Sequence, residues 1–350
     1  MKRGDVVKAR LVDVAKEAGV SPKTVSNYVN GYEFMSESTR EKVRAAVEKL
    51  QYVPNHVARN LRKGRVGIVG LAVPDLNGPY FAELAGLVTA AAERRGMTVL
   101  IDQTDGDPER ERRIAAGLGA QTIDALIMSP LALSGAEIAE IATMPLVLLG
   151  ERARPEGASY AGIDNVAAAR AATEHLLDLG RTRIAAVGRV ESQPTGTWSF
   201  RMRGFREVMQ ERGLPVPDAY CPSVRVFSRV EGERVVTELI NSSEPPDAVF
   251  CFSDMLAVGA LAALHRHDVS VPGDVAVLGF DDVREGLFTW PSLSTVAPDK
   301  RAIAEQAVSQ VVGLLDRTAA PTAEIVGFSV VARASTTGLE LPMNLQPHDA

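Results

Sequence analysis

From Val66 onward, short apolar runs alternate with segments of helical periodicity, and this alternation limits the fold more than any other feature. The apolar run Val66–Val73 is followed by helical spacing over Phe81–Arg95, and Thr98–Asp102 and Ala125–Met128 are further runs. An N-cap aspartate with a following proline predicts one more helix, beginning at Asp107. Strands separated by helices form parallel sheets that are covered by helices on both faces.

The same unit occurs a second time further along the chain. Arg183–Gly188 and Asp247–Phe252 are apolar runs, and Phe200–Arg212 and Glu231–Ile240 have helical spacing between them. Each unit is too short to account for the whole segment. We therefore predict a body of two parallel α/β lobes.

Polar residues follow several of the predicted strands. Asp75, Ser129, Ser253 and Asp254 stand directly after apolar runs. Open parallel sheets bind ligands at the carboxyl ends of their strands. Carboxylates, hydroxyls and amides bind the hydroxyls of a sugar, while aromatic rings cover its C–H face. The sequence therefore predicts a small-molecule site between the two lobes.

Ahead of the body, residues 11–30 have the spacing of a helix-turn-helix. Leu11–Ala18 carries apolar residues on one helical face, and Gly19 is placed to end that helix in a tight turn. Ser21 is a good N-cap for a second helix, with proline in its first position. The motif needs a small residue where its helices cross, a glycine in its turn and an apolar residue on its second helix. Ala15, Gly19 and Val25 supply these in that order.

A third helix is expected to continue toward Leu50. Ser38 and Glu41 have the spacing of a capping box, and Ser36 is a competing N-cap. The three helices predict a compact domain that ends near Tyr52.

The formal net charge of −6 over 350 residues hides an asymmetry. Residues 1–64, here called the head, hold 13 basic and 7 acidic residues, a net of +6. The remaining residues, here called the body, carry a net of −12. We therefore expect only the head to contact a polyanion.

The second helix of a helix-turn-helix enters the major groove of DNA. In this chain, Pro22 is the first outward-facing residue of the predicted second helix. Lys23 has the chemistry to donate to guanine, and Asn27 to pair with adenine. Thr24 and Ser26 are expected to bind phosphates, which position a protein without reading sequence.

The head ends in a short segment, Val53–Gly64, that leads into the body, with proline near its start and glycine at its end. A helix of roughly nine residues is shorter than the ~12–15 needed for stability alone in water. It is either a conditional helix that forms against DNA or a partner copy, or a plain linker.

Five stretches of the head and this segment resemble the LacI/GalR family of transcriptional regulators. They are Asp13–Ser21, Thr24–Ser26, Val29–Gly31, Tyr52–Asn55 and Ala58–Leu61. The body is similar to the periplasmic sugar-binding fold of that family's effector domain, with further matches at Pro74–Leu84, Gly162–Asn165, Leu278–Asp282 and Ser294–Val296. The resemblance runs from about Val12 to Thr337.

The resemblance implies a dimeric repressor on a near-palindromic operator. Residues 54–64 become a hinge helix, and Leu61 is the wedge that unstacks a base step in the minor groove. Asn27 differs from the arginine of the lactose repressor, so no operator sequence is carried over. The predicted DNA-binding residues are Ser21, Pro22, Lys23, Thr24, Ser26, Asn27, Tyr28, Asn30, Asn55, His56, Ala58, Arg59 and Leu61.

The resemblance also implies an effector site, with Arg201 and Asp281 as its main polar residues. Trp198, predicted to lie in a loop like Trp290, is placed to cover a sugar, and Ser253 stands where many relatives have asparagine. Asp164 and Asn165 either contact the ligand or support the backbone between the lobes. The predicted effector residues are Asp75, Tyr80, Phe81, Ser129, Glu151, Asp164, Thr197, Trp198, Arg201, Phe227, Ser253, Asp254 and Asp281.

The family's chain crosses three times between its lobes, which implies crossings here near Asp164, Thr295 and Phe328. The predicted domains are a helix-turn-helix domain (1–53), the hinge (54–64), the effector and dimerisation domain (65–338) and a disordered tail (339–350). The first lobe is expected over 65–163 and 296–327, and the second over 164–295 and 328–338.

Other function classes fit less well. The chain has no GxGxxG after its first strand and no GxxxxGK[ST], and its histidines follow no metal or triad pattern, so we expect no enzyme, cofactor or metal. A transport protein would need a secretory signal, and the first ten residues lack an apolar core. Two cysteines, Cys221 and Cys251, favour a reducing cytoplasm. A corepressor-dependent regulator, as in the family's purine-responsive members, remains an alternative.

Overall fold

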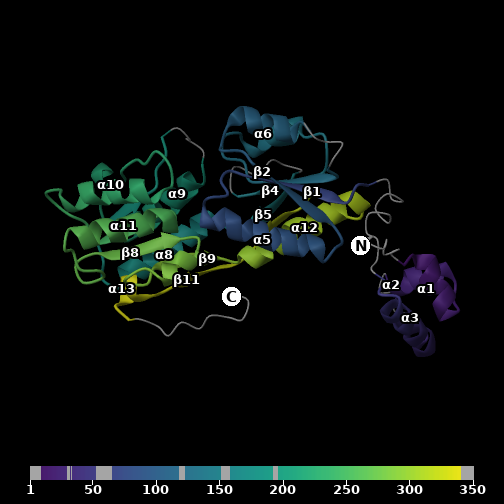
Figure 1. Ribbon diagram of the computed structural model, residues 1–350. Coiled ribbons are helices and arrows are strands. Elements are labelled where there is room, and N and C mark those ends of the chain that lie inside the picture. Colours follow the sequence, from purple (N-terminus) through teal and green to yellow (C-terminus); the bar gives the residue numbers. More distant parts are fainter. Residues whose placement is uncertain are drawn as a thin grey trace, which may run out of the picture. The chain divides into compact units, whose positions relative to one another are not determined.

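The structure is a computed structural model of the chain, shown in Figure 1. It describes residues 9–29, 32, 34–52, 65–117, 123–150, 158–191 and 196–339. The chain divides into two compact units, Met1–Gly67 and Ile68–Ala350. Each unit has a hydrophobic core of its own.

The head contains the three predicted helices: α1 (Leu11–Ala18), α2 (Pro22–Val29) and α3 (Glu37–Lys49). Gly19 ends α1 in the left-handed conformation, at φ 65°, which a residue with a Cβ adopts only at a cost. The predicted cap of α3 was wrong in one respect. Ser36, not Ser38, is the N-cap, because its Oγ accepts the Thr39 amide at 3.3 Å.

The first lobe of the body is built on a six-stranded sheet in the order β10-β5-β4-β3-β1-β2. All neighbouring strands in this sheet are parallel, as predicted. Its strands are β1 (Ile68–Val73), β2 (Thr98–Gln103), β3 (Ala125–Met128), β4 (Leu146–Leu149), β5 (Ser159–Gly162) and β10 (Ala323–Ile325). Its helices are α5 (Pro79–Glu93), α6 (Pro108–Ala115), α7 (Gly135–Ile141) and α12 (Lys300–Asp316).

The second lobe has a five-stranded sheet in the order β11-β9-β8-β7-β6. Its strands are β6 (Ile184–Val187), β7 (Ala248–Cys251), β8 (Ala276–Phe280), β9 (Ser294–Pro298) and β11 (Phe328–Val331). Its helices are α8 (Asn165–Asp178), α9 (Thr197–Glu211), α10 (Arg229–Ile240), α11 (Asp254–Arg266) and α13 (Ala334–Thr337), with short 3₁₀ turns η1 (Asp218–Tyr220) and η2 (Arg284–Leu287). The expectation of purely parallel sheets fails at β11, which pairs antiparallel with β9 at the edge.

The chain passes between the sheets at three places. It does so between β5 and α8, between β9 and α12, and between β10 and β11. The second crossing comes after Pro298, a few residues later than predicted, because Thr295 and Val296 are still paired with β8.

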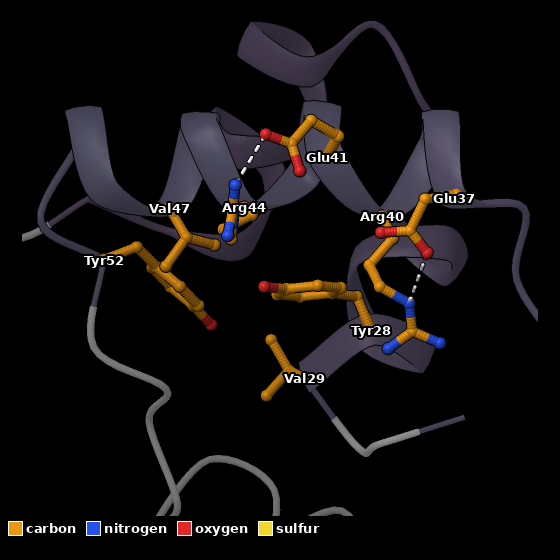
Figure 2. Close-up of a pocket in the computed structure, with 8 residues that line it drawn as sticks. All are labelled: Tyr28, Val29, Glu37, Arg40, Glu41, Arg44, Val47 and Tyr52. Atoms are coloured by element: carbon orange, nitrogen blue, oxygen red, sulfur yellow. Dashed lines mark hydrogen bonds and ion pairs between the residues drawn. The ribbon is translucent and has the colours of Figure 1, made fainter. Parts of the chain in front are cut away.

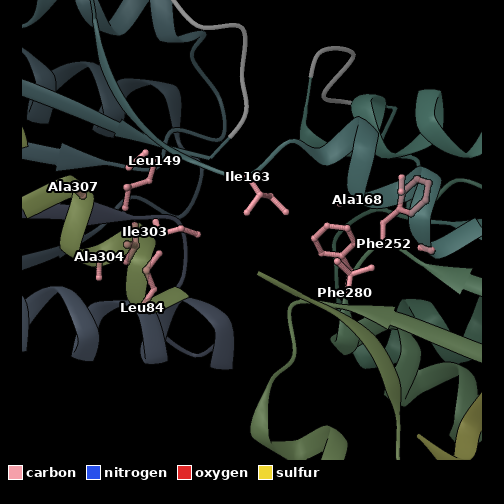
Figure 3. Packing of buried hydrophobic residues seen from close by; sticks show 14 of the residues in the cluster. Leu84, Leu149, Ile163, Ala168, Phe252, Phe280, Ile303, Ala304 and Ala307 are labelled. Atoms are coloured by element: carbon pink, nitrogen blue, oxygen red, sulfur yellow. The ribbon is translucent and has the colours of Figure 1, made fainter. Parts of the chain in front are cut away.

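Side-chain alternation along the strands gives each sheet two apolar faces. In β3, Ala125 and Ile127 pack in the cluster that contains α5 and α12, whereas Leu126 and Met128 pack in a second cluster with α6 and α7. Helices therefore cover both faces, as a buried parallel strand requires. The main cluster extends across both lobes, and Ile163 lies between them at the first crossing (Figure 3).

Helices α10 and α11 pack closely in the second lobe. A Cβ built on Gly259 would lie 2.0 Å from the Arg229 carbonyl oxygen, so only glycine allows this approach. No local pattern indicates this contact, since it joins two helices that are separated by a strand.

The buried carboxylate of Glu231, in the first turn of α10, is 2% exposed. Arg225 Nε donates to it at 2.9 Å and Arg234 Nη2 at 3.0 Å. These arginine hydrogen bonds, Arg234 first, lower the pKa of Glu231 to about 2. The ionised form is therefore the one that the folded state favours.

Stability from Glu231 should be present above the ordinary carboxyl pKa of about 4.5 and lost as the pH falls toward 2. Glu231→Gln is expected to lower stability by about 2 kcal/mol at pH 7, because a buried ionic hydrogen-bond network is broken. Thermal unfolding followed by circular dichroism should show the difference from the unmutated chain shrinking between pH 5 and pH 2. A difference that stayed constant over this range would contradict the assignment.

Candidate functional site

The head holds its second helix against the other two through an apolar core. Val14, Ala15 and Val25 are buried together with Val43 and Ala46 of α3. Ser21 caps α2, since its Oγ accepts the Thr24 amide at 3.1 Å. This is the geometry of a helix-turn-helix, with Gly19 in the turn.

The outward face of α2 carries the residues predicted to contact DNA. Pro22 and Lys23 are exposed, and Thr24, Ser26 and Asn27 are half-buried. Tyr28, also predicted to contact DNA, is half-buried, and its ring packs against the head core. The remaining predicted DNA contacts lie outside the described residues: Asn30, Asn55, His56, Ala58, Arg59 and Leu61.

A hollow of about 400 Å³ lies in the head between the end of α2 and α3 (Figure 2). Tyr28 and Tyr52 line it with two ion-paired arginines, Arg40 and Arg44, on α3. None of the predicted effector residues lines this hollow.

In the second lobe, Arg201 is the centre of a polar cluster. It lies on α9 and is 8% exposed. Its Nε donates to Asn165 Oδ1 at 2.6 Å, and its Nη1 donates to the Phe252 carbonyl oxygen. The guanidinium also stacks on Phe280, 3.4 Å from the ring centre. Three elements, α8, the end of β7 and the end of β8, therefore fix its position.

Asp281 faces this arginine from the carboxyl end of β8. Its Oδ1 lies 3.9 Å from Arg201 Nη2, a distance of charge attraction rather than of a direct hydrogen bond. Burial raises the pKa of Asp281 to about 6, although Arg201 and Lys300 act in the opposite direction. The pair predicted from the sequence is thus brought together in the fold.

Three other predicted residues are occupied by structural hydrogen bonds. Ser253 caps α11 by accepting the Leu256 amide at 3.3 Å, and Asp164 caps α8. Asp254 is fully buried, and its oxygens accept from Thr295 Oγ1 at 2.7 Å and from the Val283 amide at 2.8 Å. Because one oxygen is taken by a side chain of β9 and the other by the backbone after β8, we do not retain Asp254 among the effector contacts.

The four aromatic residues predicted for the effector site border the main apolar cluster, two from each lobe. Tyr80 and Phe81, in the first turn of α5, pack edge to face with ring centres 5.1 Å apart. Trp198 and Phe227 come from the second lobe and are partly buried against the same cluster. Trp198 was wrongly expected in a loop, since α9 begins at Thr197; Trp290 does lie outside helices and strands.

The remaining predicted residues of the first lobe lie where strands end. Asp75 follows β1, and its Oδ1 accepts the Asn77 amide at 2.8 Å. Ser129 follows β3 and is buried. Glu151 lies outside the described residues.

Sequence reasoning missed a set of charged residues at the end of β8. Glu83 on α5 and Lys300 on α12 form an ion pair next to Asp282, which is paired with Arg333 at 2.6 Å. The four residues are far apart along the chain, so no spacing could have joined them.

The described ranges contain no group of three or more His, Cys, Asp or Glu side chains arranged to hold a metal ion. No helix in them is both long and apolar enough to span a bilayer.

A helix-turn-helix head and a two-lobed α/β body with a buried arginine–aspartate pair define a class of DNA-binding regulators that carry a sensing domain. Two family models match the chain: bacterial regulatory proteins of the lacI family over residues 10–55, and a periplasmic binding protein-like domain over residues 173–336.

Similar proteins agree with this assignment. The ribose operon repressor of Escherichia coli (strain K12) is 32% identical over 319 residues, which is 90% of this chain and 94% of that protein. A solved LacI-family regulator from Sanguibacter keddieii is 38% identical over 78% of this chain and 99% of its own, with a TM-score of 0.71. The complex of the regulator CelR with cellobiose is 27% identical over 94% and 100%, with a TM-score of 0.69. The chain belongs to the lacI family of bacterial regulatory proteins.

Proposed function

We propose that the protein is a cytoplasmic repressor whose operator affinity is set by a small hydroxylated effector, most simply a sugar. The Arg201–Asp281 pair carries this proposal. A buried cation and a buried carboxylate 3.9 Å apart offer donors and acceptors to one hydroxyl placed between them. Chemistry of this kind selects a polyol rather than an apolar ligand.

The aromatic residues support the same ligand class. Tyr80, Phe81, Trp198 and Phe227 present partly buried rings from both lobes, and rings of this kind cover the C–H face of a sugar. CelR, which is similar over nearly the whole chain, was solved with cellobiose, and the Escherichia coli relative is named for ribose. Both facts concern those proteins and support the same class of ligand here.

For operator recognition we propose Lys23 and Asn27 as the base-reading residues. Lys23 is exposed near the N-terminal end of α2, and Asn27 follows one turn later on the same helix. The family resemblance adds the hinge, with Leu61 as its minor-groove wedge. Two heads in a dimer require a near-palindromic site.

A two-stage measurement tests the function. A thermal-shift screen with ribose, glucose, cellobiose, hypoxanthine and guanine finds the ligand class, and an operator selected from random DNA is then titrated with and without the best ligand. A sugar that stabilises the chain and weakens operator binding supports an inducer-controlled repressor. A purine that strengthens operator binding replaces it with the corepressor alternative, and catalytic turnover of any ligand refutes both.

We further propose that two copies associate through exposed apolar residues of both lobes. Strand β2 is an edge strand with Leu100 and Ile101 exposed, and an unpaired apolar edge is a site of association. In the second lobe, Phe288 is 68% and Trp290 86% exposed.

The combined change Leu100→Asp and Trp290→Asp is expected to produce a monomer of 37.4 kDa where the unmutated chain is a dimer. The reason is that a charge would have to be buried in each half of the interface. Light scattering after size exclusion measures the mass. Leu179→Asp, at an exposed leucine after α8, should leave the dimer intact. A dimer in the double variant would contradict these surfaces.

A further inference from the structure

The backbone that follows β8 is bound by side chains of the other lobe. Lys300 Nζ, at the start of α12, donates to the Asp282 carbonyl oxygen at 2.8 Å. Glu83 Oε1, on α5, accepts the Arg284 amide at 3.2 Å. Glu83 and Lys300 are also paired with each other, and both are largely buried. Two helices of the first lobe therefore hold the backbone of residues 282–284, which belongs to the second.

This backbone has an unusual conformation. Asp281 and Asp282 have φ angles of 112° and 49°, a region that residues with a Cβ adopt only when their surroundings hold them. The second lobe supplies part of that support, through Arg333 on the Asp282 carboxylate and Asp254 on the Val283 amide. The first lobe supplies the rest, through Lys300 and Glu83.

We propose that Glu83 and Lys300 form an interlobe latch that positions Asp281 against Arg201 and holds the two lobes in one arrangement. This inference rests on the proposed function only in treating Asp281 as an effector contact. A ligand that moves Asp281 also moves the adjacent Asp282 carbonyl, and so changes the contact with Lys300. The latch thereby gives the ligand a differential affinity for two lobe arrangements, which is what coupling between sites requires.

The chain contains a matched control for the latch. Glu305 on α12 forms ion pairs with Arg94 and Arg95 at the end of α5. It therefore joins the same two helices as the latch, but its partners both lie in the first lobe. Glu305→Gln tests the loss of an α5–α12 ion pair without touching the backbone after β8.

The experiment uses the full chain without ligand, so it does not depend on the effector. Spin labels on Arg113→Cys of α6 and Ser243→Cys after α10 report the distance between lobes, because the native cysteines are buried. Hydrogen exchange at the Val283 amide reports the motion of the backbone, since its partner Asp254 is left unchanged. Lys300→Met and Glu83→Gln are expected to broaden the distance distribution and to speed this exchange at least about fivefold.

Glu305→Gln should leave both readouts unchanged, and Lys300→Arg should restore the narrow distribution because it keeps the charge. The latch is overturned if Lys300→Met and Glu83→Gln match Glu305→Gln in both readouts, or if Lys300→Arg behaves like Lys300→Met. A failed ligand screen would refute the sugar-controlled repressor and leave these ligand-free results unaffected, so the two failures are distinguishable.

Discussion

Deletion of residues 1–64 should abolish specific operator binding, with a loss of at least about 10³-fold in affinity, while the body keeps its fold and its ligand. The size of the loss follows from the gap between specific and non-specific binding by DNA-reading proteins. The deleted residues carry a net charge of +6 and the rest a net of −12. The body should therefore be repelled by phosphates rather than attracted to them.

Fluorescence anisotropy on the selected operator measures the affinity, and thermal unfolding of the shortened chain checks its fold. The body has its own core, distinct from that of the head, so its unfolding should remain cooperative. Asn27→Ala in the full chain is the companion variant. It is expected to lose about 1–3 kcal/mol of DNA-binding free energy, and only on the preferred operator sequence. Specific operator binding by the shortened chain would refute the assignment of DNA binding to the head.

The head was predictable because every signal in it is local. A glycine that allows a left-handed turn and a serine–proline start lie within a few residues of the helices that they delimit. The error at α3 was also local in origin. Ser36 and Ser38 have the same capping chemistry, and only the path of the preceding chain decides which hydroxyl reaches an amide of the first turn.

In the body, a structural element could be predicted when the residues of a single segment determine it. Most strands that the sequence indicated are present, because a buried parallel strand is an apolar run whatever its neighbours are. The antiparallel edge strand β11 was missed, since its direction depends on how the chain returns from the first lobe. The structural role of Asp254 could not be predicted for a similar reason, because its hydrogen-bond partners, Thr295 and Val283, are distant in sequence.

The candidate effector site contains residues that could be predicted from their chemistry and other residues that hold these in position. Arg201 and Asp281 were found from their chemistry and the resemblance. Asn165 and Phe280, which orient the guanidinium by a hydrogen bond and by stacking, are visible only in the fold. Supporting residues of this kind decide how exactly a polar pair is presented to a ligand, so their loss should mimic a weaker form of the loss of Arg201 itself.

Arg201→Ala should remove the ligand response while operator binding without ligand stays within about threefold of the unmutated chain. A charge-assisted pair of hydrogen bonds to one ligand contributes about 3 kcal/mol, so ligand affinity is expected to fall by about 100-fold or more. Titration calorimetry with the sugar found in the screen measures this affinity, and anisotropy with increasing sugar measures the response. Arg201→Lys should not restore either, because an ammonium group cannot reproduce the planar contacts with Asn165, Phe252 and Phe280.

Arg203→Ala is the matched control for Arg201→Ala. Arg203 lies two positions further along α9, is exposed, and is paired with Glu207. Its loss removes an arginine from the same helix without touching the site, so ligand affinity and response should be unchanged. Because Arg201 is buried, its removal also lowers the melting temperature. Asn165→Ala separates this loss of stability from the loss of ligand binding, because it loosens Arg201 while keeping its charge. If Arg201→Ala gave the same response curve as Arg203→Ala, the effector would have to bind elsewhere in the body, and Asp281 would lose its role with it.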